Sequence, residues 1–179
     1  MTNPAMTTDP RYPIGKAELR GRLDDRARAT AIAQIAALPA AMHDAVRGLD
    51  QTQLDTPYRD GGWSVRKVVH HVADSHVNAY VRCKLVATES DPPLKGYDEN
   101  AWSTLADANA SVGSSLLLLT ALHERWAEFL RSLPAAAFAR TGLHSERGKM
   151  TLDDLTALYA WHGRHHAAHV TTLRAAKGW

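Results

Sequence analysis

The chain has 179 residues, 45% of them hydrophobic, and carries 21 Lys and Arg against 19 Asp and Glu, a formal net charge of +2. This is the size and composition of one globular domain with a substantial core. Neither charge forms a long run, so nucleic-acid binding is not expected. The one cysteine, Cys83, excludes an internal disulfide, and no segment has the length and hydropathy of a signal peptide or a membrane span. A cytoplasmic protein is therefore expected.

The first 22 residues contain three prolines and two glycines, which interrupt any regular pattern. We expect residues 1–22 to form an N-terminal arm, with the first ten residues loose and the rest packed. The domain itself is predicted to occupy residues 23–179.

Hydrophobic periodicity then predicts four helices, which cover residues 24–47, 64–90, 111–133 and 151–176. Ser64, Ser111 and Thr151 stand where N-cap residues are expected, and Thr151 opens a variant capping box. Pro39 is expected to kink the first helix or to divide it.

Two connections between these helices are long. Residues 94–109 are predicted to form a loop over the end of the bundle, and residues 142–149 a hairpin-like turn. Helices of 20 to 25 residues are rods of about 30 to 37 Å. The fold class expected is therefore all-α, a four-helix bundle with long crossover loops.

The last helix contains histidines at the four-residue spacing that places side chains on one face, His162 with His166 and His165 with His169. On a helical wheel His162 and His166 fall within about 20° of the middle of the apolar stripe, whereas His165 lies about 80° away. A buried neutral histidine needs partners for both ring nitrogens. Either a metal ion supplies one, or these are core histidines bonded to a tyrosine or a water.

The second helix is expected to supply a third ligand, and its candidates are His71 and His76. His76 falls within the apolar cluster of the wheel, as core histidines do, and His71 lies about 100° to one side. His71 shares its flank with Ser75, Asn78 and Arg82, a polar stripe expected where a helix lines a polar cleft. The helical pattern alone does not choose between the two histidines.

Short motifs spread over nearly the whole chain match those of a known family. They are YPIGK (12–16), TPYR (56–59), GGWSVR (61–66), VHHVADSH (69–76), YDE (97–99), AW (101–102) and YAWHGRHH (159–166). In these motifs the chain resembles the YfiT-type members of the DinB-like metalloprotein superfamily.

The resemblance implies a bundle of up-down-down-up type that forms a homodimer and holds one divalent metal per subunit, Zn²⁺ in the first place or else Ni²⁺. It implies the ligands His71, His162 and His166 and thereby chooses His71 over His76. Three neutral imidazoles leave one coordination position open, as in catalytic zinc sites.

The resemblance implies a metal-dependent hydrolase acting on a small molecule. The first alternative is an S-transferase that activates a metal-bound low-molecular-weight thiol such as bacillithiol or mycothiol. It is favoured because Gly163 stands where zinc proteases carry the glutamate that acts as general base, and no other general base is evident. The second alternative is a stress-response bundle that binds metal without catalysis.

Three residues are candidates for substrate binding, Asn78, Arg82 and Tyr97. Asn78 and Arg82 lie on the flank of His71 and could orient a carboxylate or a sugar hydroxyl. Tyr97 begins a segment that extends to Trp102, and this segment is expected to be either a lid over the site or a dimer contact.

Overall fold

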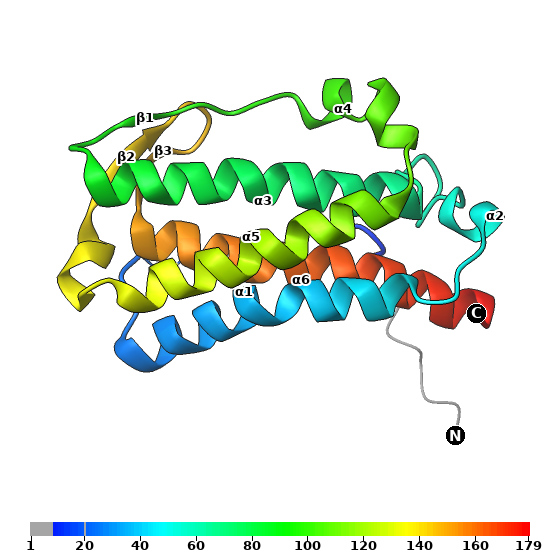
Figure 1. Cartoon of the computed structure of the whole chain (residues 1–179), viewed down its shortest axis with the longest axis horizontal. Coiled ribbons are helices and arrows are strands. Elements are labelled where there is room, and N and C mark those ends of the chain that lie inside the picture. Colours follow the sequence, from blue (N-terminus) through cyan, green and yellow to red (C-terminus); the bar gives the residue numbers. More distant parts are fainter. Residues whose placement is uncertain (1–8, 20) are drawn as a thin grey trace.

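The computed structural model describes residues 9–19 and 21–179, so residues 1–8 and 20 of the predicted arm lie outside the described residues. Its long helices are α1 (Asp25–Val46), α3 (Val65–Thr88), α5 (Val112–Ser132) and α6 (Leu152–Lys177). Shorter elements connect them (Figure 1): α2 (Gln51–Leu54), β1 (Pro93–Leu94), α4 (Glu99–Trp102), η1 (Ala106–Asn109), η2 (Ala135–Ala139), β2 (Thr141–His144) and β3 (Gly148–Thr151).

The four long helices form a bundle of up-down-down-up type. Helices α1 and α6 run in one direction along the bundle and α3 and α5 in the other (Figure 1). Both α1 and α3 pack against α5 and against α6. The predicted four-helix bundle is therefore confirmed.

Local sequence sets the ends of these helices. Asp24, Ser64 and Ser111 each accept a backbone N–H at a helix start, and Thr151 forms a complete capping box with Asp154. Every predicted helix boundary lies within two residues of the observed one. Such agreement is expected because caps depend on neighbouring residues only.

Helix α1 continues through Pro39, so of the two expected effects, a kink or a division, the division does not occur. A proline has no N–H, and the carbonyl four residues earlier, that of Ile35, therefore receives no hydrogen bond from position 39. This carbonyl accepts a hydrogen bond from another helix, described below.

The connection between α3 and α5 differs from the predicted loop over the bundle end. It runs along the outside of α3 from β1 to α4 (Figure 1) and includes η1, which packs on α3. Because α3 and α5 point in the same direction, the chain must return over the length of α3, about 36 Å for 24 residues. The parallel arrangement of these helices thus dictates the path.

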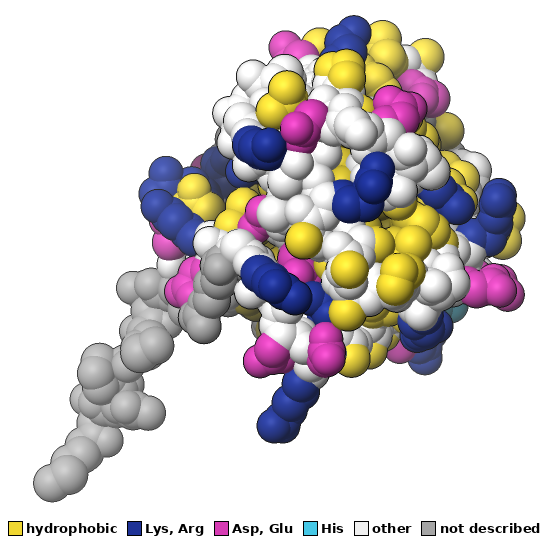
Figure 2. Space-filling view, turned by 90° about the vertical axis from the view of Figure 1, so that its left-hand side faces the viewer, with side chains coloured by type: hydrophobic (Ala, Val, Ile, Leu, Met, Phe, Trp, Pro, Cys, Tyr) yellow, Lys and Arg dark blue, Asp and Glu magenta, His cyan; other side chains and the backbone are white. Residues whose placement is uncertain are grey.

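A small sheet closes the end of the bundle opposite α2. Strands β2 and β3 form an antiparallel hairpin, which is the turn predicted for residues 142–149, and β1 pairs parallel with β2. On the face that carries this end of the molecule, Lys and Arg side chains are interspersed with Asp and Glu side chains (Figure 2). Among the described side chains on that face, neither charge gathers into a large patch.

The described part of the arm is attached to α6. The indole Nε1 of Trp161 donates to the carbonyl of Gly15 at 3.3 Å, and directly after the arm the backbone N–H of Leu23 donates to Asp153 Oδ2 at 3.0 Å. Arg28 completes this attachment, because its guanidinium forms a buried ion pair with Asp153 at 2.8 Å.

Two groups of buried apolar side chains fill the bundle. One lies toward the sheet and includes Ile35, Cys83 and Trp126, so Cys83 is a core residue. The other lies toward α2 and includes Val72 and Leu119. Among the described residues no helix combines the length and the apolar character that crossing a membrane requires.

Candidate metal centre

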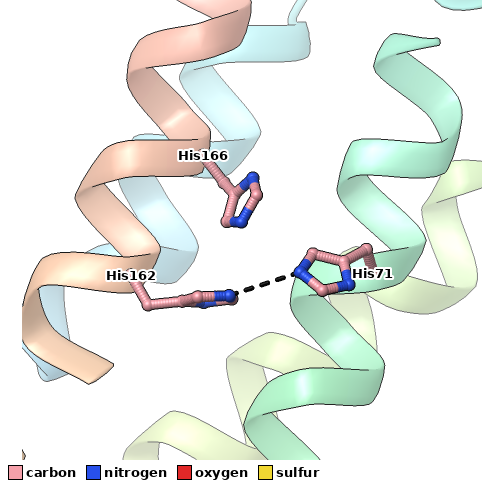
Figure 3. A group of neighbouring side chains, drawn as sticks. All are labelled: His71, His162 and His166. Carbon is pink, nitrogen blue, oxygen red and sulfur yellow. Dashed lines mark hydrogen bonds between the residues drawn. The ribbon is translucent and has the colours of Figure 1, made fainter. Parts of the chain in front are cut away.

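Three histidines from two helices converge in the middle of the bundle (Figure 3). His71 comes from α3, and His162 and His166 come from consecutive turns of α6. One ring nitrogen of each lies within 4.8 Å of the others, and the Nε2 atoms of His71 and His162 are 3.3 Å apart. These are the three residues that the family resemblance implied as ligands.

Packing of α3 against α6 brings these side chains together. The rings of His162 and His166 have centroids 4.5 Å apart, as expected for side chains one helical turn apart. The His71 ring lies 4.8 Å from that of His166 and is supported on another side by Trp63, 4.7 Å away. Trp63 directly precedes the N-cap of α3, so the start of this helix also positions its histidine.

The cluster is held in the neutral form that binds metals. Burial is the main cause that lowers the pKa of His71 to about 4, and the nearby His169 adds to this effect. Burial also lowers the pKa values of His162 and His166 well below 6.5, and neighbouring histidines add to this effect. Desolvation disfavours the charged imidazolium, so at neutral pH all three rings have a lone pair available for a metal.

The donor set fits a divalent ion of the zinc type. With Zn–N bonds of about 2.0–2.1 Å, two nitrogens bound to one tetrahedral ion are about 3.3 Å apart, which matches the His71–His162 distance of 3.3 Å. Three imidazoles occupy three of four tetrahedral positions and leave one open. Metal binding by these three residues stays a prediction, which the geometry supports.

His76, the competing candidate, lies behind His162 and outside this group. Its Nε2 is 3.0 Å from Nδ1 of His162, the nitrogen that faces away from the cluster. Its Nδ1 is 3.0 Å from Nε2 of His123 on α5, and both His76 and His123 are fully buried.

A polar pocket adjoins the cluster at His162. Its cavity volume is about 80 Å³, and both Arg82 and Tyr97 line it. Arg82 is fixed there, because its Nη1 donates to the hydroxyl of Tyr159 at 2.8 Å. Asn78 does not line this pocket, and its amide donates to the carbonyl of Asp74 on its own helix.

The pocket also receives charged residues that sequence reasoning did not place. Glu99, at the start of α4, and Glu146 and Arg147, in the turn of the β2–β3 hairpin, line it together with Arg82. Burial is the main cause that raises the pKa of Glu99, and the charge of Glu146 raises it further. No local pattern identifies the hairpin residues, because their approach to His162 depends on how the hairpin folds back over α6.

Position 163 has no room for the glutamate that acts as general base in zinc proteases. A Cβ on Gly163 would lie 2.5 Å from Cδ2 of Leu38, because α1 packs directly against this face of α6. Position 163 therefore faces another helix and not the pocket. Asp74 and Asp98, two further acidic residues on α3 and at the start of α4, do not line the pocket.

The comparisons with known proteins agree with this site and fold. The model of the DinB superfamily matches residues 34–170. Over 171 residues the chain is 47% identical to a protein of Bacillus mycoides (strain KBAB4) and to one of Bacillus cereus (strain 03BB102), each named "Putative metal-dependent hydrolase". Each match covers 96% of this chain and 99% of the relative.

A solved structure shares the architecture. It is that of YfiT from Bacillus subtilis, described as "a probable metal-dependent hydrolase with an unusual four-helix bundle topology". It superposes with a TM-score of 0.93 at 44% identity, covering 96% of this chain and 99% of YfiT. The chain therefore belongs to the DinB superfamily, and its similarity to YfiT confirms the resemblance seen in the sequence motifs.

Proposed function

We propose that this chain is a metal-dependent hydrolase of small molecules in which His71, His162 and His166 hold one divalent ion, Zn²⁺ or else Ni²⁺. The observation that carries the proposal is the convergence of three neutral imidazoles beside a polar pocket. The names of the relatives support the hydrolase class.

When bound, such an ion supplies Lewis acidity, which polarises a carbonyl and lowers the pKa of water. Glu99 is the proton acceptor that this proposal assigns, because it lines the same pocket as His162 and its raised pKa makes it a stronger base. Arg82 orients a carboxylate or hydroxyl of the substrate, since its guanidinium is already fixed by Tyr159. The substrate class proposed is a small ester or amide.

The residues that line the pocket weaken the argument for thiol transfer, the first alternative. Its support was that no general base was evident, and Glu99 and Glu146 both line the pocket. Metal binding without catalysis is the other alternative. Both are distinct outcomes of the test below.

The test begins with elemental analysis of the purified protein and continues with an ester and amide panel and a thiol-conjugation panel. We expect one divalent ion per chain, and hydrolysis that stops with chelator, returns with Zn²⁺ and is lost in His162→Ala. Glu99→Gln should lower kcat by about 10²–10⁴-fold, whereas Glu128→Gln, an exposed carboxylate on α5, should leave kcat unchanged.

Three outcomes would overturn the proposal. Hydrolysis that persists in His162→Ala with chelator would remove the metal mechanism. Turnover in the thiol panel alone would replace hydrolysis by S-transfer. Metal binding without turnover in either panel would favour the non-catalytic alternative.

We also propose that the chain forms a homodimer, as the family resemblance implies. Light scattering on the eluting protein should then give twice the chain mass of 19.6 kDa. A single-chain mass at all concentrations would exclude the dimer.

A further inference from the structure

A layer of hydrogen-bonded histidines crosses the bundle between its two apolar groups. We call His76, His123 and His162 the histidine layer. His162 Nδ1 lies 3.0 Å from His76 Nε2, and His76 Nδ1 lies 3.0 Å from His123 Nε2. The layer ends on α1, where His123 Nδ1 lies 2.6 Å from the carbonyl oxygen of Ile35. All four long helices thus contribute one polar group.

The end of the layer determines the direction of every hydrogen bond in it. A carbonyl oxygen can only accept, so His123 Nδ1 carries a hydrogen and donates to Ile35. In a neutral His123 the other nitrogen, Nε2, must then accept from His76 Nδ1. By the same rule His76 Nε2 accepts from His162 Nδ1. His162 is left with its Nε2 lone pair, which faces His71.

The surroundings keep the layer neutral, as this argument requires. His76 and His123 are completely inaccessible to solvent. Burial lowers the pKa of His123 to about 4, so the ring is uncharged at neutral pH. A cationic His123 would still donate to Ile35, but it would reverse the two hydrogen bonds between histidines and place a hydrogen on His162 Nε2.

Pro39 provides the acceptor at the end of the layer. In an uninterrupted helix the N–H of residue 39 would donate to the carbonyl of Ile35, and a proline has no such hydrogen. The carbonyl is therefore available to His123 on the neighbouring helix α5. Pro39 thus accounts both for the missing hydrogen bond within α1 and for the direction of the hydrogen bonds in the histidine layer.

We propose that His76 and His123 are positioning residues for the metal centre, which hold His162 in the tautomer whose Nε2 lone pair faces the ion. The inference rests on the proposed metal site and adds residues that do not touch the ion. His166 offers a contrast, because its Nδ1 is buried without a hydrogen-bond partner among the described residues. Of the two ligands on α6, the protein orients His162 through its Nδ1.

Zn²⁺ affinity tests the proposal, measured by competition with a chromophoric chelator. His76→Leu and His123→Leu should weaken binding about 10–100-fold, as loss of an outer-shell partner does. His76→Gln should recover most of the affinity, because its amide can accept from His162 and donate to His123. His70→Leu is the matched control: His70 is also buried on α3 and bonds to Ser115 and to Ala110, and its loss should leave affinity unchanged.

Nitrogen-15 NMR of the metal-free wild type gives a second readout, the protonation of each ring nitrogen of His162, which does not depend on metal affinity. His162, assigned by the signals lost in His162→Ala, should show a protonated Nδ1 and an unprotonated Nε2. The opposite tautomer, or wild-type affinity in folded His76→Leu, would overturn the proposal. Failure of the wild type to bind Zn²⁺ would instead overturn the proposed function and leave the tautomer measurement valid.

Discussion

His162 belongs to three groups of residues: the proposed ligand cluster, the histidine layer and the lining of the pocket. Its Nε2 faces His71, its Nδ1 faces His76, and its ring forms part of the pocket wall. His71 and His166 each belong to the ligand cluster but do not line that pocket. At the residue scale, His162 is therefore the position where loss of a side chain should affect metal binding, ring orientation and substrate contact together.

Replacing His162 with alanine should reduce Zn²⁺ affinity by more than the about 10–100-fold expected for an outer-shell partner, because a direct ligand is lost. Chelator competition measures this. His165→Ala is the control, since His165 lies on the adjacent face of α6 and stacks on Trp161, with ring centroids 4.3 Å apart. Equal loss of affinity in the two variants would show that the ligand set is wrong.

At the scale of elements, α6 is held against α1 by close approach and by charge. Gly163 allows the approach, since a Cβ there would meet Leu38. Arg28 and Asp153 form a buried ion pair between the two helices, and Asp153 also accepts the backbone N–H of Leu23. These contacts fix the helix that carries two of the three proposed ligands.

Gly163→Ala should destabilise the fold by about 1–3 kcal/mol, the usual cost of an overpacked core. Urea unfolding followed by tryptophan fluorescence measures this change. Gly113→Ala is the matched control, because a Cβ at Gly113 would meet only Ser111 Oγ at 3.4 Å and alanine is the better helix former. A Gly163→Ala protein as stable as the wild type would contradict the close packing described.

Asp153→Ala should lower the free energy of unfolding by up to about 3–5 kcal/mol, because Arg28 would lose its buried partner and keep only the exposed Asp25 as an ion-pair partner. The double variant Arg28→Met with Asp153→Ala should lose less, since it leaves no uncompensated buried charge. Urea denaturation of both proteins compares them. Equal loss in the single and double variants would show that the buried charge is not the cause.

At the scale of the whole molecule, the bundle consists of two apolar groups separated by a polar layer. This layer links stability to pH. The pKa of His123 is about 4 in the folded chain against a usual value of 6.5, so between these values the unfolded chain binds more protons. The folded state therefore becomes less stable as the pH falls through this window.

For His123 alone, the loss of stability from pH 7 to pH 4 should be about 3 kcal/mol, given about 1.4 kcal/mol for each pKa unit. Urea unfolding of metal-free protein at a series of pH values measures it. His123→Gln, which keeps hydrogen-bonding groups and does not titrate, should show a shallower dependence on pH. An identical dependence in both proteins would assign the effect to other groups.

Sequence reasoning succeeded where the cause is local and failed where it is not. The helix starts at Asp24, Ser64 and Ser111 were predictable because a cap involves residues within one turn. The path between α3 and α5 was not, because it follows from the direction in which two distant helices pack.

The candidate site shows the same division. Four-residue spacing on α6 offered two pairs of histidines, and the helical wheel selected His162 with His166. The wheel of α3 could not separate His71 from His76, since both side chains are buried. What distinguishes them is the atom of His162 that each one faces: His71 faces Nε2, and His76 faces Nδ1. Only motif resemblance carried that information in the sequence.

Pro39 has a consequence for attempts to make this protein more heat-resistant. A proline inside a helix costs about 3 kcal/mol, so scales of helix propensity would nominate Pro39→Ala as an improvement. The alanine N–H would then compete with His123 for the Ile35 carbonyl. Selection for melting temperature alone would therefore favour a change that loosens His162, the proposed ligand on another helix, and engineering here must screen metal affinity alongside thermal tolerance.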